Sequence, residues 1–121
     1  MANQSTVLVD SVHASDVGIS VILPLLSEKA KGCGYHGQTN PLHTVQYTTV
    51  NNFIGTIVIQ GSLATTPTED DWYYITSFGD AITPMTDRAI VENFAGQHVW
   101  IRSRVTDFTA GEINRVLYSH N

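Results

Sequence analysis

Apolar and polar residues alternate with a period of two along much of this chain. Between residues 53 and 63 every second residue is apolar or glycine, while Thr56, Gln60 and Ser62 take intervening positions. Successive side chains of a β-strand point to opposite faces of the sheet, so the pattern is typical of a half-buried strand. It appears again at 45–49 and at 99–105. The residues that we place in the core are Phe53, Ile57, Ile59, Trp72, Val99 and Ile101.

Segments of this kind are separated by turn-rich stretches, which predicts an all-β protein. About eight of them lie near residues 5–9, 18–25, 44–50, 54–63, 72–78, 88–94, 97–106 and 112–119. Short strands with turns between them are typical of antiparallel sandwiches. Only 28–31 and 67–71 look helical, and neither is longer than a turn. We expect one antiparallel, jelly-roll-like β-sandwich over residues 1–121.

Three regions outside the clearest strands have distinct expected structures. Residues 67–71 contain a proline, a threonine and three acids, and can form one capped turn because such side chains satisfy free amides at the start of a turn. Residues 27–43 hold three glycines and a proline, which predicts a long surface loop. Long loops in compact domains usually have a function. Residues 1–17 are expected to be an N-terminal arm or the first strand.

A short motif recurs at residues 52–59, 93–101 and, more loosely, 107–113. Each copy begins with Asn or Asp, continues with Phe, and has a glycine two or three residues later. We interpret the motif as a shared way of starting strands, in which Phe fills the end of the core and Gly permits the bend. The copies are too few and too unevenly spaced for a repeat protein.

The composition favours binding to other proteins over binding to nucleic acid. Charged residues make up 14% of the chain, against roughly 25% in ordinary soluble domains, which suits outer faces that meet other subunits. Eleven acidic and six basic residues give a net charge of -5, so we expect no DNA or RNA partner. No segment resembles a signal peptide or a membrane-spanning helix, so we expect no membrane partner and synthesis in a host cytoplasm.

Residues that could carry catalysis or hold a metal do not form recognisable motifs. Cys33 is the only cysteine, lies between glycines without the context of a nucleophile, and is expected to be exposed. His36 and His43 are seven residues apart, which is not a metal-ligand spacing, so we interpret them as polar loop residues. The acidic run 69–71 lacks the alternating ligands and central glycine of a calcium loop. We therefore expect no enzyme activity, no metal and no cofactor.

The strand predicted at 97–106 carries an unusual outer face. If its valines and isoleucine face the core, Trp100, Arg102 and Arg104 point outward. Trp and Arg are enriched at protein interfaces, so this face either contacts a partner or covers the edge of the sandwich. The arginines can also pair with acids such as Glu92 on a neighbouring strand. The interface candidates are Tyr35, His36, Trp100, Arg102 and Arg104.

Several short motifs between residues 30 and 118 carry a resemblance to a known group of proteins. They are Gly34-Tyr35-His36-Gly37, Leu42-His43-Thr44-Val45-Gln46-Tyr47, Phe53-Ile54-Gly55-Thr56-Ile57, Gln60-Gly61-Ser62-Leu63-Ala64, Asp71-Trp72 and Trp100-Ile101-Arg102. In these motifs the chain resembles small virion structural proteins of tailed phages, in particular of large phages that infect cyanobacteria. It is also similar to the jelly-roll sandwich of discoidin-type and carbohydrate-binding modules.

The resemblance implies a non-enzymatic structural protein of the virion. It would decorate or cement the capsid, or be an accessory of the neck, tail or baseplate, with other virion proteins and further copies of itself as partners. The alternative is a carbohydrate-binding module that recognises a host surface glycan, because aromatic rings can stack on sugars as well as fill a core. The aromatic residues available for this are Tyr35, Tyr47, Trp72, Tyr73, Tyr74 and Tyr118.

Overall fold

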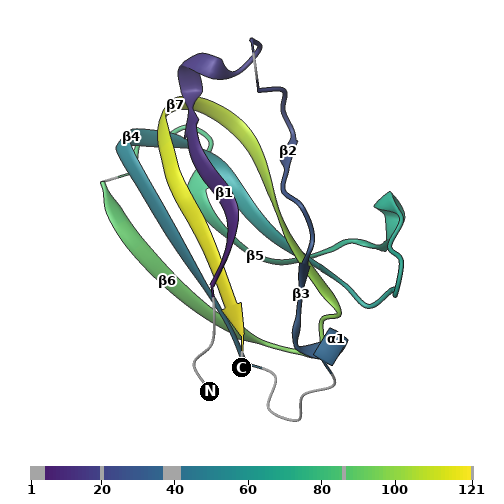
Figure 1. Cartoon of the computed structure of the whole chain (residues 1–121). Helices are drawn as coiled ribbons and strands as arrows, with labels where there is room; N and C mark the ends of the chain where they lie inside the picture. The colour runs from purple at the N-terminus through teal and green to yellow at the C-terminus, as the bar shows by residue number, and fades with distance from the viewer. Residues whose placement is uncertain (1–4, 20, 37–41, 86, 121) are drawn as a thin grey trace.

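The structure of the chain is a computed structural model that describes residues 5–19, 21–36, 42–85 and 87–120, although the side chains of His36 and Arg88 lie outside the described part. Its strands form one antiparallel sheet (Figure 1). The strands are β1 (Thr6–His13), β2 (Leu25–Leu26), β3 (Ala30–Lys31), β4 (Leu42–Ser62), β5 (Tyr73–Asp80), β6 (Arg88–Ala95) and β7 (Trp100–His120). Single helical turns are η1 (Ala14–Asp16), α1 (Cys33–His36) and η2 (Glu69–Asp71). Within the described residues, no helix is long and apolar enough to cross a membrane. The prediction of an antiparallel all-β protein is confirmed.

The strands β4 and β7, of 21 residues each, lie at the centre of the sheet and divide it into two parts. The first half of β4 pairs with β6 and with the second half of β7. Its second half pairs with β5 and with the first half of β7. On the other side of β7, β1 pairs with the second half, and β2 and β3 with the first. The segments predicted at 44–50 and 54–63 are therefore one continuous strand, as are those at 97–106 and 112–119.

Two copies of the recurring Asn/Asp–Phe motif lie inside the central strands, where these change direction, and the third lies at the end of β6, so the motif does not start strands as expected. Asn52 and Asp107 have φ values of 58° and 55°, a left-handed conformation that Asn and Asp tolerate better than other non-glycine residues. The phenylalanines that follow, Phe53 and Phe108, are buried with ring centroids 5.3 Å apart. At Gly111, which has φ of 82°, a Cβ atom would lie 2.6 Å from the Cα of Phe53, so glycine is required. The two bends thus pack against each other.

One hydrophobic core lies between the two parts of the sheet. Tyr47, in the first half of β4, stacks on Phe78 of β5 with ring centroids 4.9 Å apart and planes 11° apart. These residues belong to different parts of the sheet, so the two parts face each other across this contact. Four of the six predicted core residues, Phe53, Ile57, Ile59 and Ile101, are fully buried.

The other two predicted core residues, Trp72 and Val99, are half-buried, so that prediction was wrong for them. Trp72 lies on the outer side of β7, where the guanidinium of Arg102 is 4.3 Å from its ring centroid. Val99 lies in the turn before β7, and its backbone bonds with Ser62 and Gly32 hold it at the rim of the core. Alternation gives the direction of a side chain within a strand, and neither residue belongs to one.

The region before β4 differs most from the prediction. Of the strand expected at 18–25 only residue 25 lies in β2, and residues 28–31, expected to be helical, are extended with Ala30–Lys31 in β3. The segment 27–43 was expected to be a surface loop, but its residues 32 and 33 are buried. The cause is backbone pairing, since the amides of Gly32 and Gly34 donate to the carbonyl oxygens of Val99 and His98. Residues 6–13 form β1, and residues 1–4 and 37–41 lie outside the described part.

Candidate functional site

Two lysines and two aromatic rings form a cluster beside the start of β7, which we call the Lys–aromatic patch: Lys29, Lys31, Tyr35 and Trp100. Trp100 is half-buried and the other three residues are exposed. The sheet pairs Lys31 with Trp100, and the ring of Tyr35, carried by α1, lies 5.1 Å from the Trp100 ring. The ammonium group of Lys29 is 5.0 Å from the Trp100 ring centroid, and that of Lys31 is 4.7 Å from the Tyr35 ring centroid. These distances allow cation–π contacts. The indole N–H of Trp100 donates to the carbonyl oxygen of Thr65 at 3.0 Å, which fixes the ring.

Both lysines of the patch keep their charge available to a partner. In the part of the chain that the structure describes, the ion pairs are His13 with Glu112 and Arg102 with Glu69, so no carboxylate lies within ion-pair distance of Lys29 or Lys31. The chain as a whole has a net charge of -5, so a patch with two unpaired ammonium groups differs strongly from the average surface. Tyr35, with 46% of its surface exposed, adds an apolar ring at the centre.

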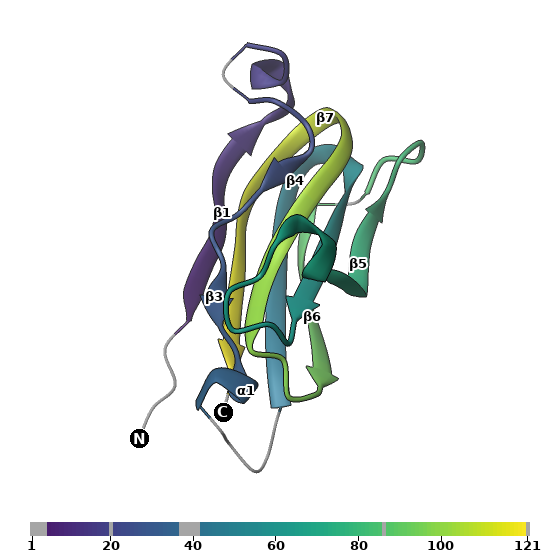
Figure 2. The ribbon, with the colours of Figure 1, turned by 90° about the vertical axis from the view of Figure 1, so that its right-hand side faces the viewer.

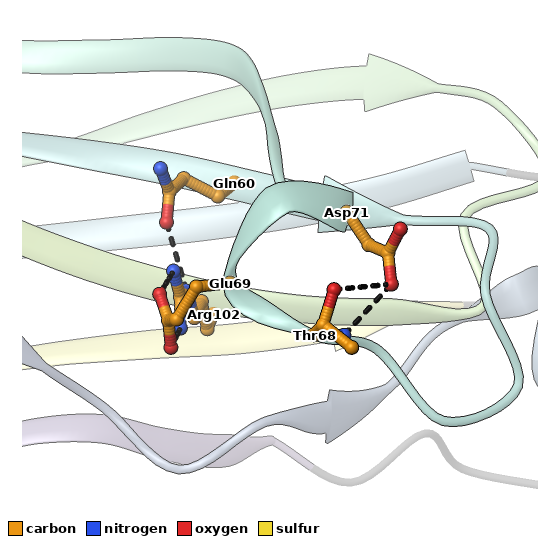
Figure 3. A network of polar contacts seen from close by, with 5 residues as sticks. All are labelled: Gln60, Thr68, Glu69, Asp71 and Arg102. Carbon is orange, nitrogen blue, oxygen red and sulfur yellow. Dashed lines mark hydrogen bonds and ion pairs between the residues drawn. The ribbon is translucent and has the colours of Figure 1, made fainter.

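Arg102 faces outward from β7 as predicted, but the chain itself covers it. The segment between β4 and β5 crosses the outer side of β7 (Figure 2). Its Glu69 accepts two hydrogen bonds from the guanidinium, at 3.2 and 3.1 Å, and Gln60 accepts one from Nε at 2.8 Å (Figure 3). The side chain of Arg102 is thereby buried, and its charge holds the pKa of Glu69 below the usual range, through the hydrogen bonds first. The predicted partner Glu92 instead accepts a hydrogen bond from Thr76.

The turn that carries Glu69 is capped as the sequence predicted. The Asp71 carboxylate accepts hydrogen bonds from the backbone amide of Thr68 at 2.7 Å and from its hydroxyl at 3.1 Å. In return the Asp71 amide donates to the Thr68 carbonyl oxygen. This reciprocal arrangement stiffens a short turn, so Glu69 is held in place against Arg102 (Figure 3).

The structure brings two of the five interface candidates, Tyr35 and Trp100, into contact. Arg102 is occupied by Glu69 and Gln60, and Arg104 is half-buried where β2 pairs with β7. The side chain of His36 lies outside the described residues.

A second cluster is centred on the fully buried His43, and we call it the buried histidine cluster: Cys33, His43, Tyr73, His98 and Tyr118. His43 is completely buried and stacks on Phe94 at 4.8 Å. Its Nε2 lies 2.7 Å from the carbonyl oxygen of Gly96, which can only accept, so Nε2 carries the proton. Nδ1 is therefore the acceptor for the Tyr118 hydroxyl, 2.6 Å away.

His98 repeats this arrangement at a more exposed position. Its Nε2 lies 3.2 Å from the carbonyl oxygen of Ala95, and its Nδ1 lies 2.6 Å from the Tyr73 hydroxyl. The rings of His43 and His98 are 5.2 Å apart. Two His–Tyr pairs thus hold neighbouring carbonyl groups of the turn between β6 and β7, which leaves both imidazoles neutral with their nitrogens satisfied.

Burial governs the acid–base behaviour of this cluster. It lowers the pKa of His43, and the nearby His98 and His120 lower it further, while the bond to Gly96 acts in the opposite direction. Burial likewise lowers the pKa of His98. The pKa of Tyr118 is raised by burial and by the neighbouring Cys33 thiol. All these groups therefore favour their neutral forms.

The centre of this cluster, formed by Cys33, His43 and Tyr118, is closed to solvent, whereas Tyr73 and His98 lie at its more exposed edge. Cys33 was expected to be exposed but is fully buried, with its Sγ 4.0 Å from His43 Nδ1, because the glycines on either side let α1 pack directly on the turn before β7. His43 and Tyr118 have 0% and 1% of their surface exposed. Among the described residues, no group of three His, Cys, Asp or Glu side chains is arranged to hold a metal ion. The cluster is arranged to hold a turn in place.

Sequence reasoning missed the lysines of the patch and the inward position of His43. The alternation that runs through Val45, Tyr47 and Thr49 continues backward to His43, which was the available signal for its burial. Lys29 and Lys31 are two residues apart, as side chains on one face of a strand are, but a helical turn was expected there.

Comparisons of the chain with models of protein families, with curated proteins and with solved structures found no match.

Proposed function

We propose that the chain is a non-enzymatic assembly protein of a tailed-phage virion, which attaches to its neighbours through the Lys–aromatic patch. The observation that carries the attachment is the Tyr35–Trp100 ring pair, in which Tyr35 is exposed and Trp100 half-buried, with an ammonium group beside each ring that makes no ion pair with a described residue. Trp and Tyr side chains are frequent anchors of protein interfaces, and polar groups surround them at the rim. The origin in a virion is supported by the sequence motifs that resemble phage structural proteins.

A binding role is also supported by where the reactive groups lie. Cys33, His43 and Tyr118, which have the side chains most suited to nucleophilic or acid–base chemistry, are buried with at most 1% of their surface exposed. A substrate would have to displace the core to reach them. The accessible groups of the patch, by contrast, are suited to contact and charge recognition.

The direct test is the composition of purified particles of the phage that encodes the chain. Mass spectrometry should find the protein in the virion in stoichiometric amounts, and its absence would overturn the proposal.

A variant carrying Tyr35→Ser and Trp100→Ala should fold but be incorporated several-fold less than the unaltered chain. The matched control is Tyr74→Ser, which removes a ring that is 64% exposed on β5, outside the patch, and should leave incorporation unchanged.

Glycan binding is a second candidate, favoured by Tyr74. This ring lies on β5 and is 64% exposed. In the patch, cations of the same chain already lie over the rings of Tyr35 and Trp100, which leaves those rings less open to a sugar. Binding of host polysaccharide that is lost in Tyr74→Ser would establish this candidate, and an array of host glycans without any binding would remove it.

A further inference from the structure

The surface beside the Lys–aromatic patch carries the opposite charge. The segment that follows β4 contacts the patch directly, since the Thr65 carbonyl oxygen accepts a hydrogen bond from Trp100. A few residues later the same segment forms the acidic turn η2. Glu69 of that turn is occupied by Arg102, but Asp70 is exposed and makes no ion pair with any described residue. Unpaired carboxylate and ammonium groups therefore lie on one surface without neutralising each other.

A surface with adjacent, unpaired charges of opposite sign is complementary to itself after a two-fold rotation. In such a contact the same patch is used by both subunits, and each basic region meets the acidic region of the other copy. We infer that the partner of the Lys–aromatic patch is a second copy of this chain, with Lys29 and Lys31 of each copy facing the Asp70 turn of the other. This inference rests on the proposed assembly role and names the partner.

Apolar groups supply the centre that such a contact needs, because exposed ion pairs by themselves contribute only about 0–1 kcal/mol. Tyr35 is 46% exposed, and Leu63, which directly follows the residue that β4 pairs with Trp100, is 64% exposed. Tyr35 contacts Trp100 within the patch, and Leu63 follows the strand partner of Trp100, so Leu63 lies beside the patch. An aromatic and aliphatic centre with a charged rim is the usual anatomy of an interface between proteins.

The same charges disfavour other partners. A nucleic acid attracted by Lys29 and Lys31 would meet the carboxylates of Asp70 and Asp71 beside them, and the six basic residues of the whole chain are outnumbered by eleven acidic ones. A second copy would present its acidic turn to the lysines and its own lysines to Asp70.

The test is a charge-exchange experiment by sedimentation velocity on the purified full chain. The unaltered chain should form a dimer that weakens as salt increases. Lys31→Glu and Asp70→Lys, each measured alone, should dimerise about tenfold more weakly or worse, because each places like charges opposite one another twice. An equimolar mixture of the two variants should recover most of the dimer, since both contacts between residues 31 and 70 then join opposite charges. Arg115→Glu and Asp10→Lys make the same charge changes on the other part of the sheet and should dimerise like the unaltered chain.

Three results would overturn the inference. They are a chain that stays monomeric at all concentrations, a dimer insensitive to both charge variants, and single variants that weaken the dimer without recovery in the mixture. Circular dichroism of each variant establishes that it is folded. Failure here is distinguishable from failure of the proposed function. A chain found in particles, whose incorporation still depends on Tyr35 and Trp100, retains the assembly role with a different partner. A dimer that is absent from purified particles would overturn the proposed role in a virion and leave the self-association.

Discussion

The buried histidine cluster and the Lys–aromatic patch meet at α1 and at the start of β7 but have opposite properties. In α1, Cys33 points inward to His43 while Tyr35, two residues later, contacts Trp100 on the outside. The inner cluster pairs the imidazole nitrogens of His43 and His98 with a hydroxyl or a carbonyl group and favours neutral forms. The outer patch keeps two ammonium groups charged and without a carboxylate partner among the described residues.

The difference shows how a short stretch of chain can hold the fold on one side and present a contact surface on the other. Buried polar groups must be hydrogen-bonded, and each one left unpaired costs about 1–3 kcal/mol. Exposed charges have no such requirement because water solvates them, so they are available to a partner. Substitutions in the inner cluster should therefore change stability, and substitutions in the outer patch should change association.

The largest effect on the free energy of unfolding is expected for His43→Ala. This change leaves the Tyr118 hydroxyl and the Gly96 carbonyl group without their partner and opens a cavity beneath Phe94. The free energy of unfolding should fall by about 3 kcal/mol, measured by urea denaturation at neutral pH. His13→Ala is the control, because that exposed imidazole only pairs with Glu112 on the surface, and it should cost well under about 1 kcal/mol. If both variants lost the same free energy of unfolding, the burial of His43 would not contribute to stability as proposed.

An intermediate effect on the free energy of unfolding is expected when the pH is lowered. The pKa values of His43 and His98 are lowered in the folded state, chiefly by burial, so the unfolded chain binds protons first as the pH falls below about 6.5. The contribution of these histidines is complete above that pH and decreases as the pH falls towards their folded-state pKa values. Each can contribute a slope of up to about 1.4 kcal/mol per pH unit.

Urea denaturation between pH 7.5 and 5.5 measures this slope, and His43→Gln should reduce it. A stability that rises as the pH falls through this range would contradict the assignment of neutral imidazoles.

The smallest effect on stability is expected in the patch. Lys29→Ala together with Lys31→Ala removes cation–π contacts that are open to solvent, so the free energy of unfolding should change by about 1 kcal/mol or less. The same double variant should abolish or strongly weaken self-association in sedimentation velocity. A large loss of stability with unchanged association would reverse the roles assigned to the inner and outer sides.

Much of the local structure could be predicted because it depends on neighbours in sequence. Alternation placed Phe53, Ile57 and Ile59 inside, since a strand sends successive side chains to opposite faces. The capped turn expected within 67–71 followed from its threonine and acids, whose side chains satisfy free amides at the start of a turn. Of the candidate site, the sequence indicated Tyr35 and Trp100 as residues suited to an interface, but not that they touch.

The sequence by itself determined the all-β antiparallel character and the buried faces of the central strands, whereas the Asn/Asp–Phe motif, interpreted as the start of strands, lies at bends inside β4 and β7. Only the tertiary structure decided which halves of β4 and β7 lie side by side, because that pairing joins residues as far apart as His43 and His120. It also decided that Glu69 covers Arg102 and that the amides of Gly32 and Gly34 draw Cys33 inside. Contacts between segments distant in sequence depend on the geometry of the folded chain, which no local spacing of residue types contains.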